Sequence, residues 1–217
     1  IDTYGDLHIV VNNAGINRDR MFASMSEAEW DAIMAVHLKG HFCISSHAVQ
    51  HWRDQSKAGK KVDARIINTT SGAGLQGSIG QSNYAAAKAG IAALTLNQAA
   101  ELGRYGITAN AIAPAARTGM TTAVEAMATR MAAPEDGSFD YWAPENVSSL
   151  IVWLASTEAA HVTGRVFESE GGKISIAAGW RSTAGVDKRA RWMPAEVGTA
   201  VKELLANEVP AQKVYGT

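Results

Sequence analysis

The sequence predicts an α/β fold with a parallel sheet, and three observations support this prediction. Short apolar runs, typical of buried strands, recur along the chain, and glycine, asparagine or proline residues follow them. Segments with the helical spacing of apolar residues lie between these runs. The chain has 217 residues, 47% of them hydrophobic, which is enough to bury a sizeable core. Strands that alternate with helices are typical of a parallel sheet.

The predicted elements follow from local signals. We predict strands over residues 7–11, 65–69, 107–113 and 165–168, a loop over 71–74, a short helix with a mobile loop over 118–141, and a helix near 196–206. Ser26 and Glu29 form a capping box, which begins a helical pattern that runs to Val49 in one or two segments. Pro114 closes the third strand, and Pro144 opens a helix at its first turn, where proline is favoured.

Residues 83–103 are predicted to form a long helix that is rich in alanine. Apolar or small side chains lie nearly all around this helix. A helix that is apolar on all sides is buried on all sides. We therefore expect one side to cover the sheet and the other to meet a partner subunit, in a homodimer or homotetramer.

Composition excludes several classes of protein. The net charge of -1 gives no basic excess for nucleic-acid binding, and no apolar run has membrane-spanning length. The single cysteine, Cys43, cannot form an internal disulfide, which favours the reducing cytoplasm. His47 and His51 share a helix face, but no third ligand accompanies them, so no metal site is predicted.

Tyr84 and Lys88 form the sharpest motif, because residues four apart share one face of a helix. An ammonium beside a phenol lowers the phenol pKa from about 10 toward working pH, which suits general acid-base catalysis. Ser71 follows the second predicted strand, residues 12–15 follow the first, and Pro114 closes the third. Ligands of open parallel sheets bind outside the carboxyl ends of the strands, so these residues are predicted to share one crevice.

Together, Asn12-Asn13-Ala14-Gly15, Ser71 and Tyr84-x-x-x-Lys88 resemble the short-chain dehydrogenase/reductase family over about residues 7–180. A narrower resemblance is to the 3-hydroxyacyl-CoA dehydrogenase unit of peroxisomal multifunctional enzyme type 2. Residues 13–20, 36–40 and 112–121 carry this narrower resemblance, together with Phe167-Glu168 and Gly179-Trp180.

The family resemblance implies a Rossmann-type doubly wound sheet and a nicotinamide cofactor, NAD or NADP. It implies that Tyr84 exchanges a proton with the substrate and that Lys88 lowers the Tyr84 pKa and holds the nicotinamide ribose. It also implies that Ser71 hydrogen-bonds the reacting oxygen and that Thr118 approaches the nicotinamide carboxamide. The implied cofactor-binding residues are Asn13, Ala14, Gly15, Tyr84, Lys88, Pro114 and Thr118.

The implied reaction interconverts a secondary alcohol and a ketone. The expected substrate is a 3-hydroxyacyl or 3-oxoacyl thioester, and a steroid alcohol or a 3-oxoacyl-carrier-protein are the alternatives. His37 stands where the family usually has a catalytic asparagine, and the narrower group also has histidine there. His37 either keeps a proton relay through its backbone carbonyl or packs within the helix.

The family's glycine-rich phosphate loop, with the residue that selects NAD or NADP, is expected in three βα units before residue 1. Residues 1–180 are therefore predicted to be the C-terminal catalytic part of one Rossmann-type domain, and 181–217 a tail with a helix. We expect the first strand to be an unpaired sheet edge and this stretch alone to bind cofactor poorly. The alternative is a non-catalytic fragment that only assembles with partners through helix 83–103.

Overall fold

The structure is a computed structural model that describes residues 1–123, 125–206, 208–210 and 212–217. It divides the chain into two compact units, Ile1–Ala177 together with Val214–Thr217, and Ala178–Lys213. The second unit contains helix α7 (Pro194–Ala206), which matches the helix predicted near residues 196–206. No helix in the described part of the chain is long and apolar enough to cross a membrane.

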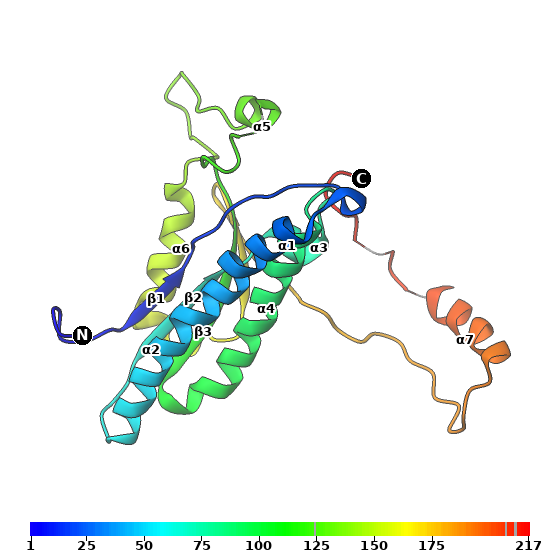
Figure 1. Ribbon diagram of the computed structural model, residues 1–217, viewed down its shortest axis with the longest axis horizontal. Coiled ribbons are helices and arrows are strands. Elements are labelled where there is room, and N and C mark those ends of the chain that lie inside the picture. The colour runs from blue at the N-terminus through cyan, green and yellow to red at the C-terminus, as the bar shows by residue number, and fades with distance from the viewer. Residues whose placement is uncertain (124, 207, 211) are drawn as a thin grey trace. The chain divides into compact units, whose positions relative to one another are not determined.

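A five-stranded sheet forms the centre of the first unit, in the order β1-β2-β3-β4-β5 (Figure 1). The first four strands are parallel, which confirms the predicted α/β fold, and β5 is antiparallel to β4. Within the described residues β1 pairs only with β2, so it is an edge strand, as predicted. The strands are β1 (Ile9–Asn12), β2 (Ala64–Thr69), β3 (Ile107–Ala115), β4 (Val166–Glu170) and β5 (Lys173–Ile176).

Three details of the sheet differ from the sequence prediction. Strand β3 continues through Pro114, which pairs in register with Ser169; a proline near the end of a strand removes few ladder hydrogen bonds. Strand β5 was not predicted, although Gly171-Gly172 before Lys173-Ile174-Ser175-Ile176 is a hairpin signal. Strand β1 is buried only at alternate residues, because side chains of a strand point to opposite faces of the sheet.

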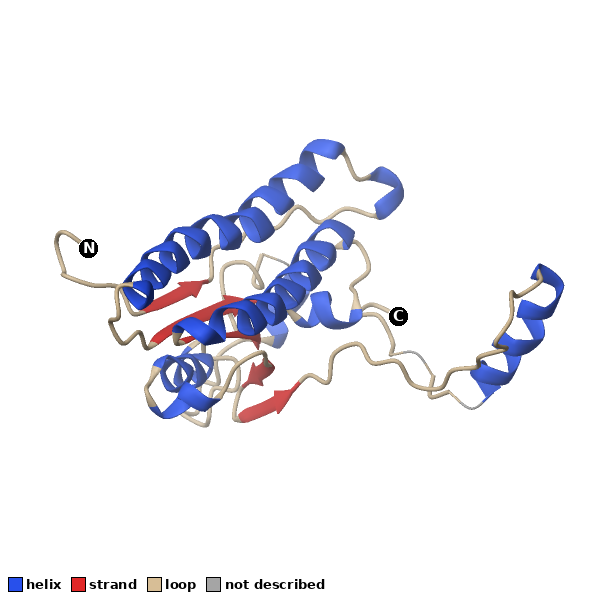
Figure 2. Cartoon of the chain, turned by 90° about the horizontal axis from the view of Figure 1, so that it is seen from below, coloured by secondary structure: helices blue, strands red, loops and turns tan. Residues whose placement is uncertain are grey.

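Helices cover both faces of the sheet (Figures 1 and 2). Ile66 of β2 packs in one core cluster with Trp52 of α2 and Leu102 of α4. The next residue, Ile67, packs on the other face with Leu150 of α6. The helices are α1 (Glu27–Met34), α2 (Gly40–Lys57), α3 (Gly72–Gln76), α4 (Ser82–Leu102), α5 (Glu125–Arg130) and α6 (Glu145–Ala155). Short helical turns are η1 (Phe22–Ser24), η2 (Ala35–Lys39), η3 (Gly103–Tyr105) and η4 (Glu158–His161).

The helical pattern that follows Ser26 forms two helices joined by a π-helical turn. The predicted capping box is present: the Ser26 hydroxyl accepts the Glu29 N–H at 3.2 Å, and Glu29 accepts the Ser26 N–H at 2.9 Å. The π-helical turn η2 separates α1 from α2 and contains His37. Such turns occur often at functional sites, because they change the direction of side chains and carbonyls.

The segment predicted as a loop over residues 71–74 is instead the start of α3. Ser71 is the N-cap of this helix, and its side chain accepts the Ala73 N–H at 3.3 Å. A Cβ atom on Gly74 would lie 2.6 Å from the Lys88 Cβ atom, so glycine lets α3 approach α4 closely. The short helix expected within residues 118–141 is α5; residue 124, in the same predicted segment, lies outside the described residues.

Candidate active site

Ser71, Tyr84 and Lys88 lie together where α3 and α4 begin. Tyr84 is in the first turn of α4, and the Lys88 Nζ atom one turn later lies 5.5 Å from the centre of the Tyr84 ring. The Ser71 side chain lies near enough to Tyr84 to lower the pKa of the Tyr84 phenol. The structure therefore brings together the three residues that the sequence selects as the reacting group.

Lys88 is a buried ammonium held at the end of β2. Its side chain is 2% exposed, and Nζ donates to the Thr69 carbonyl at 2.7 Å. Burial lowers the pKa of Lys88 to about 8, because removal from water disfavours the charged form. An ammonium has three donors, of which the Thr69 carbonyl takes one.

Burial also controls the ionisation of Tyr84. Loss of solvent raises the Tyr84 pKa above its usual value, while the neighbouring Ser71 side chain acts in the opposite direction. The net direction is thus opposite to the lowering by Lys88 that the family resemblance implies. The neutral phenol is the favoured form in this structure, which suits donation of a proton to a substrate oxygen.

His37 is completely buried beside Tyr84. The two rings meet edge to face with their centres 5.2 Å apart. The His37 Nε2 atom lies 2.8 Å from the Ile16 carbonyl oxygen, which fixes the ring against the loop after β1. The His41 Nδ1–H donates to the His37 carbonyl at 2.7 Å. His41 thus engages one of the two lone pairs of this carbonyl oxygen, while the His37 ring itself packs on Tyr84.

Both histidines are held in the neutral form. Burial lowers the pKa of His37, and the nearby Lys88 charge lowers it further, against a raising effect of the Ile16 backbone. Burial likewise lowers the pKa of His41 to about 4, with a further contribution from Lys88. An imidazole of this kind acts at neutral pH as a fixed hydrogen-bonding group.

The loop after β1 carries the predicted cofactor residues Asn13, Ala14 and Gly15. The Thr69 hydroxyl donates to the Asn13 Oδ1 atom at 3.1 Å, which joins this loop to the end of β2. A Cβ atom on Gly15 would lie only 2.7 Å from the His37 Cε1 atom. Gly15 therefore has to be glycine for the loop to pass this close to the buried ring.

The remaining predicted residues lie at the carboxyl end of β3. Pro114 lines a cavity of about 200 Å³ with Gly72 and Tyr215. Thr118 is exposed, and its backbone N–H donates to the Thr121 hydroxyl at 2.8 Å within the same loop. The structure thus joins Ser71, Tyr84, Lys88 and His37 by direct contacts, whereas the hydrogen bonds of Thr118 are to Thr121 and Thr122 in its own loop.

Sequence reasoning missed several residues that shape the site. His41 and Thr69 hold His37 and Lys88, and Asn83 directly precedes Tyr84. A polar asparagine within the alanine-rich helix was a signal for Asn83. Tyr215 gave no local signal, because the chain returns to this region from a distant segment to pair with Ser78.

Comparison with known proteins agrees with this geometry. Residues 1–129 match the family described as short chain dehydrogenase. The chain is 46% identical over 220 residues to hydroxyacyl-CoA dehydrogenase ChsB1 of Mycobacterium tuberculosis, which covers 98% of this chain and 67% of that protein. It is 38% identical over 194 residues to peroxisomal multifunctional enzyme type 2 of Mus musculus, covering 89% of this chain and 24% of that protein.

A solved structure shows the same relationship. The crystal structure of a short chain dehydrogenase from Mycobacterium avium superposes with a TM-score of 0.88 at 58% identity, covering 100% of this chain and 69% of that chain. The chain belongs to the short-chain dehydrogenase/reductase family. It is therefore an oxidoreductase of a nicotinamide-dependent class, and its cofactor is NAD or NADP.

Proposed function

We propose that this chain carries the catalytic residues of an enzyme that interconverts 3-hydroxyacyl and 3-oxoacyl thioesters with NAD or NADP. The observation that supports this most directly is the contact group of Ser71, Tyr84 and Lys88 at the start of α4. A phenol, a hydroxyl and a buried ammonium in contact provide a proton donor, an oxygen-binding group and a charge that favours phenolate.

Each of these side chains has a separate role in the proposal. Ser71 holds the reacting oxygen of the substrate through its hydroxyl. Tyr84 gives the proton to that oxygen in reduction and takes it back in oxidation. Lys88 stabilises the phenolate that remains, and its two other donors hold ribose hydroxyls. The bound nicotinamide supplies or accepts the hydride.

The residues around this group fit such a cofactor. Gly15 has no side chain, so its backbone lies directly against the His37 ring. The loop of Asn13, Ala14 and Gly15 therefore passes close to the catalytic group. Thr69 connects the buried Lys88 charge to the same loop, because its carbonyl accepts from Lys88 and its hydroxyl donates to Asn13. We propose that Pro114 and Thr118 complete the cofactor site from the end of β3, and that His37 orients Tyr84 by packing.

Similarity supports a coenzyme A thioester over a carrier-protein thioester or a steroid alcohol. The relative from Mycobacterium tuberculosis is named a hydroxyacyl-CoA dehydrogenase, and this chain covers two thirds of its length. A steroid alcohol and a 3-oxoacyl-carrier-protein remain the competing substrates within the same reaction class. The proposed catalytic part is residues 1–180, and the proposed location is the cytoplasm.

A surface groove supports assembly as a further property. Met34, Leu38, Phe42 and Leu94 line an open apolar groove of about 530 Å³ along η2, α2 and α4. Phe42, which lines this groove, is 57% exposed. Exposed apolar patches of this kind mark protein interfaces, so we propose a homodimer or homotetramer through α4. Assembly without catalysis is the competing function.

Cofactor oxidation with defined substrates tests the proposal. The full-length protein is assayed with NADH and NADPH against acetoacetyl-CoA, acetoacetyl-acyl-carrier-protein and a 3-oxosteroid. We expect acetoacetyl-CoA to give the highest kcat/KM with one of the two cofactors. A preference for the steroid or the carrier protein contradicts the substrate assignment. Cofactor binding without turnover of any of the three favours the assembly function.

A further inference from the structure

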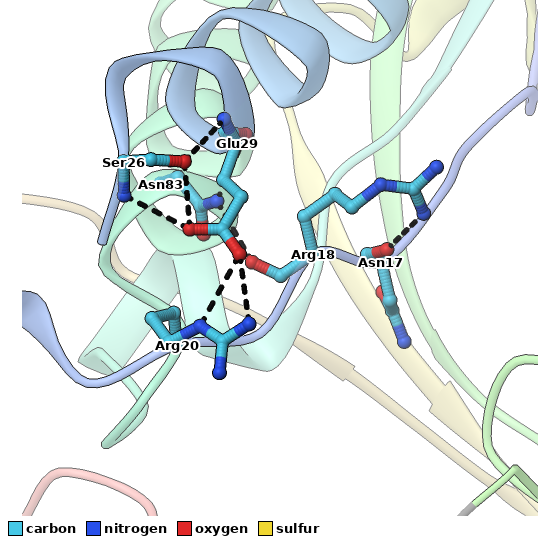
Figure 3. A network of polar contacts seen from close by, with 6 residues as sticks. All are labelled: Asn17, Arg18, Arg20, Ser26, Glu29 and Asn83. Atoms are coloured by element: carbon cyan, nitrogen blue, oxygen red, sulfur yellow. Dashed lines mark hydrogen bonds and ion pairs between the residues drawn. The ribbon is translucent and has the colours of Figure 1, made fainter. Parts of the chain in front are cut away.

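Asn83, which directly precedes Tyr84, uses its whole side chain in hydrogen bonds to backbone. It is completely buried. Its Nδ2 atom donates to the Arg18 carbonyl at 3.0 Å and to the Glu29 carbonyl at 3.2 Å (Figure 3). Its Oδ1 atom accepts the Tyr84 N–H at 2.8 Å. Three segments of the chain therefore meet at one carboxamide.

The bond to Tyr84 replaces a missing helix cap. The first four N–H groups of an α-helix have no acceptor within the helix. Gln81, the N-cap residue of α4, makes no side-chain capping hydrogen bond. The Asn83 oxygen satisfies the Tyr84 N–H instead, so the backbone of Tyr84 is fixed by its neighbour's side chain.

The two bonds from Nδ2 fasten this turn to the surroundings of the site. Arg18 lies in the loop that begins with Asn13, Ala14 and Gly15, and Glu29 lies in the first turn of α1. Figure 3 shows how Glu29 is itself held, by the Ser26 capping box and by an ion pair with Arg20 at 3.1 Å. The start of α4 is thus tied to the loop after β1 and to α1.

We propose that Asn83 is a positioning residue, which holds the Tyr84 hydroxyl against Ser71 and beside Lys88. This inference rests on the proposed catalytic role of Tyr84. Alanine at position 83 leaves the Tyr84 N–H and two carbonyls without this partner, and the first turn of α4 loses its attachment. The phenol then occupies a wider range of positions, while Lys88, held by Thr69 one turn later, stays in place.

Kinetics of three variants of the full-length protein test the inference. Asn83→Ala removes all three hydrogen bonds. Asn83→Ser is a milder change, because the serine hydroxyl can still form a hydrogen bond. Arg20→Ala is the matched control, because it breaks the ion pair to Glu29 but leaves every Asn83 bond. We expect kcat to fall about 10- to 100-fold in Asn83→Ala, since small misplacement of a reacting group costs this much. The kcat of Asn83→Ser is expected to lie between those of the wild type and Asn83→Ala. Arg20→Ala is expected to retain the wild-type kcat.

Two further readouts separate positioning from loss of stability. In Asn83→Ala the pH profile of kcat is expected to shift upward, because Tyr84 moves away from the Ser71 side chain, which lowers the pKa of the phenol. The phenolate absorbance of each protein minus that of its Tyr84→Phe counterpart reports the Tyr84 titration without any turnover. This titration is expected to move to higher pH in Asn83→Ala and to stay in place in Arg20→Ala.

The outcomes distinguish this inference from the proposed function. If Asn83→Ala lowers the thermal stability alone, with wild-type kcat and Tyr84 titration, the positioning role is wrong. If the wild-type protein turns over none of the tested ketones, the proposed function is wrong, and the absorbance titration still decides whether Asn83 positions Tyr84.

Discussion

The imidazole of His41 bridges the π-helical turn and the end of strand β2. Its Nδ1–H donates to the His37 carbonyl at 2.7 Å, and its Nε2 atom accepts the Thr69 N–H at 3.4 Å. The carbonyl of the same Thr69 residue accepts from Lys88 at 2.7 Å. The neutral imidazole of His41 therefore links His37, which stands where the family has asparagine, to Thr69, which holds the Lys88 ammonium.

The burial of His41 makes the stability of the protein dependent on pH. The folded pKa of His41 is about 4, against a usual value of 6.5, so between these pH values the unfolded chain binds a proton that the folded chain does not. Stability therefore falls as the pH drops through this window. We expect His41→Asn to reduce this slope and to lower the free energy of unfolding at neutral pH by about 1–3 kcal/mol, through loss of buried hydrogen bonds.

Urea unfolding across this pH range checks the prediction. His47→Asn, an exposed substitution on the same helix, is expected to leave both the slope and the neutral stability unchanged. An unaltered pH slope in His41→Asn shows that His41 is not the group that titrates.

Lys88 is expected to be required for turnover but not for stability. Its pKa is lowered to about 8 from 10.5, so its charged form is disfavoured in the folded state, and the stability of the protein rises as the pH increases through this window. Lys88→Met removes that penalty while filling similar space. We expect loss of turnover with no decrease in the free energy of unfolding at neutral pH, measured by urea titration. A large destabilisation identifies Lys88 as a structural residue.

Gly15 is predicted to tolerate no side chain. A Cβ atom there would lie 2.7 Å from a His37 ring that is buried and fixed by Ile16. Gly15→Ala is expected to lower the free energy of unfolding by about 1–3 kcal/mol through overpacking, and to weaken cofactor binding. Gly103→Ala, at the far end of α4, is the control, because no atom lies within 4 Å of its added Cβ. Equal behaviour of the two variants in thermal unfolding and cofactor titration contradicts this account of the loop.

Phe42 of α2 tests the proposed assembly. It lines the apolar groove and is 57% exposed. Phe42→Asp is expected to shift the protein to a smaller species in analytical ultracentrifugation, because a charge opposes burial at an interface. Val152→Asp, at a 68% exposed position of α6, leaves the mass unchanged. A wild-type mass that is already monomeric disproves the proposed oligomer.

The sequence was sufficient for the features that depend on local chemistry. The capping box of Ser26 and Glu29, the long helix with Tyr84 and Lys88, and the parallel strands all follow from spacing within a short stretch of chain. Their physical causes are hydrogen bonds and apolar periodicity among near neighbours.

The features that were missed depend on contacts between distant segments. Asn83 bonds to Arg18 and Glu29, which lie 65 and 54 residues away. The role of His41 becomes visible only when β2 lies beside α2, and Pro114 enters a strand because Ser169 of β4 pairs with it. Tertiary packing decides such contacts, and no local pattern specifies which backbone groups a buried polar side chain reaches.

Proton transfer between Tyr84 and the substrate is tested most directly by the variant Tyr84→Phe. The phenylalanine keeps the ring that packs on His37 but has no hydroxyl for Ser71 or the substrate. With acetoacetyl-CoA and the preferred cofactor, kcat is expected to fall at least about 100-fold, with thermal stability retained. If Tyr84→Phe keeps the wild-type kcat, proton transfer by Tyr84 is wrong.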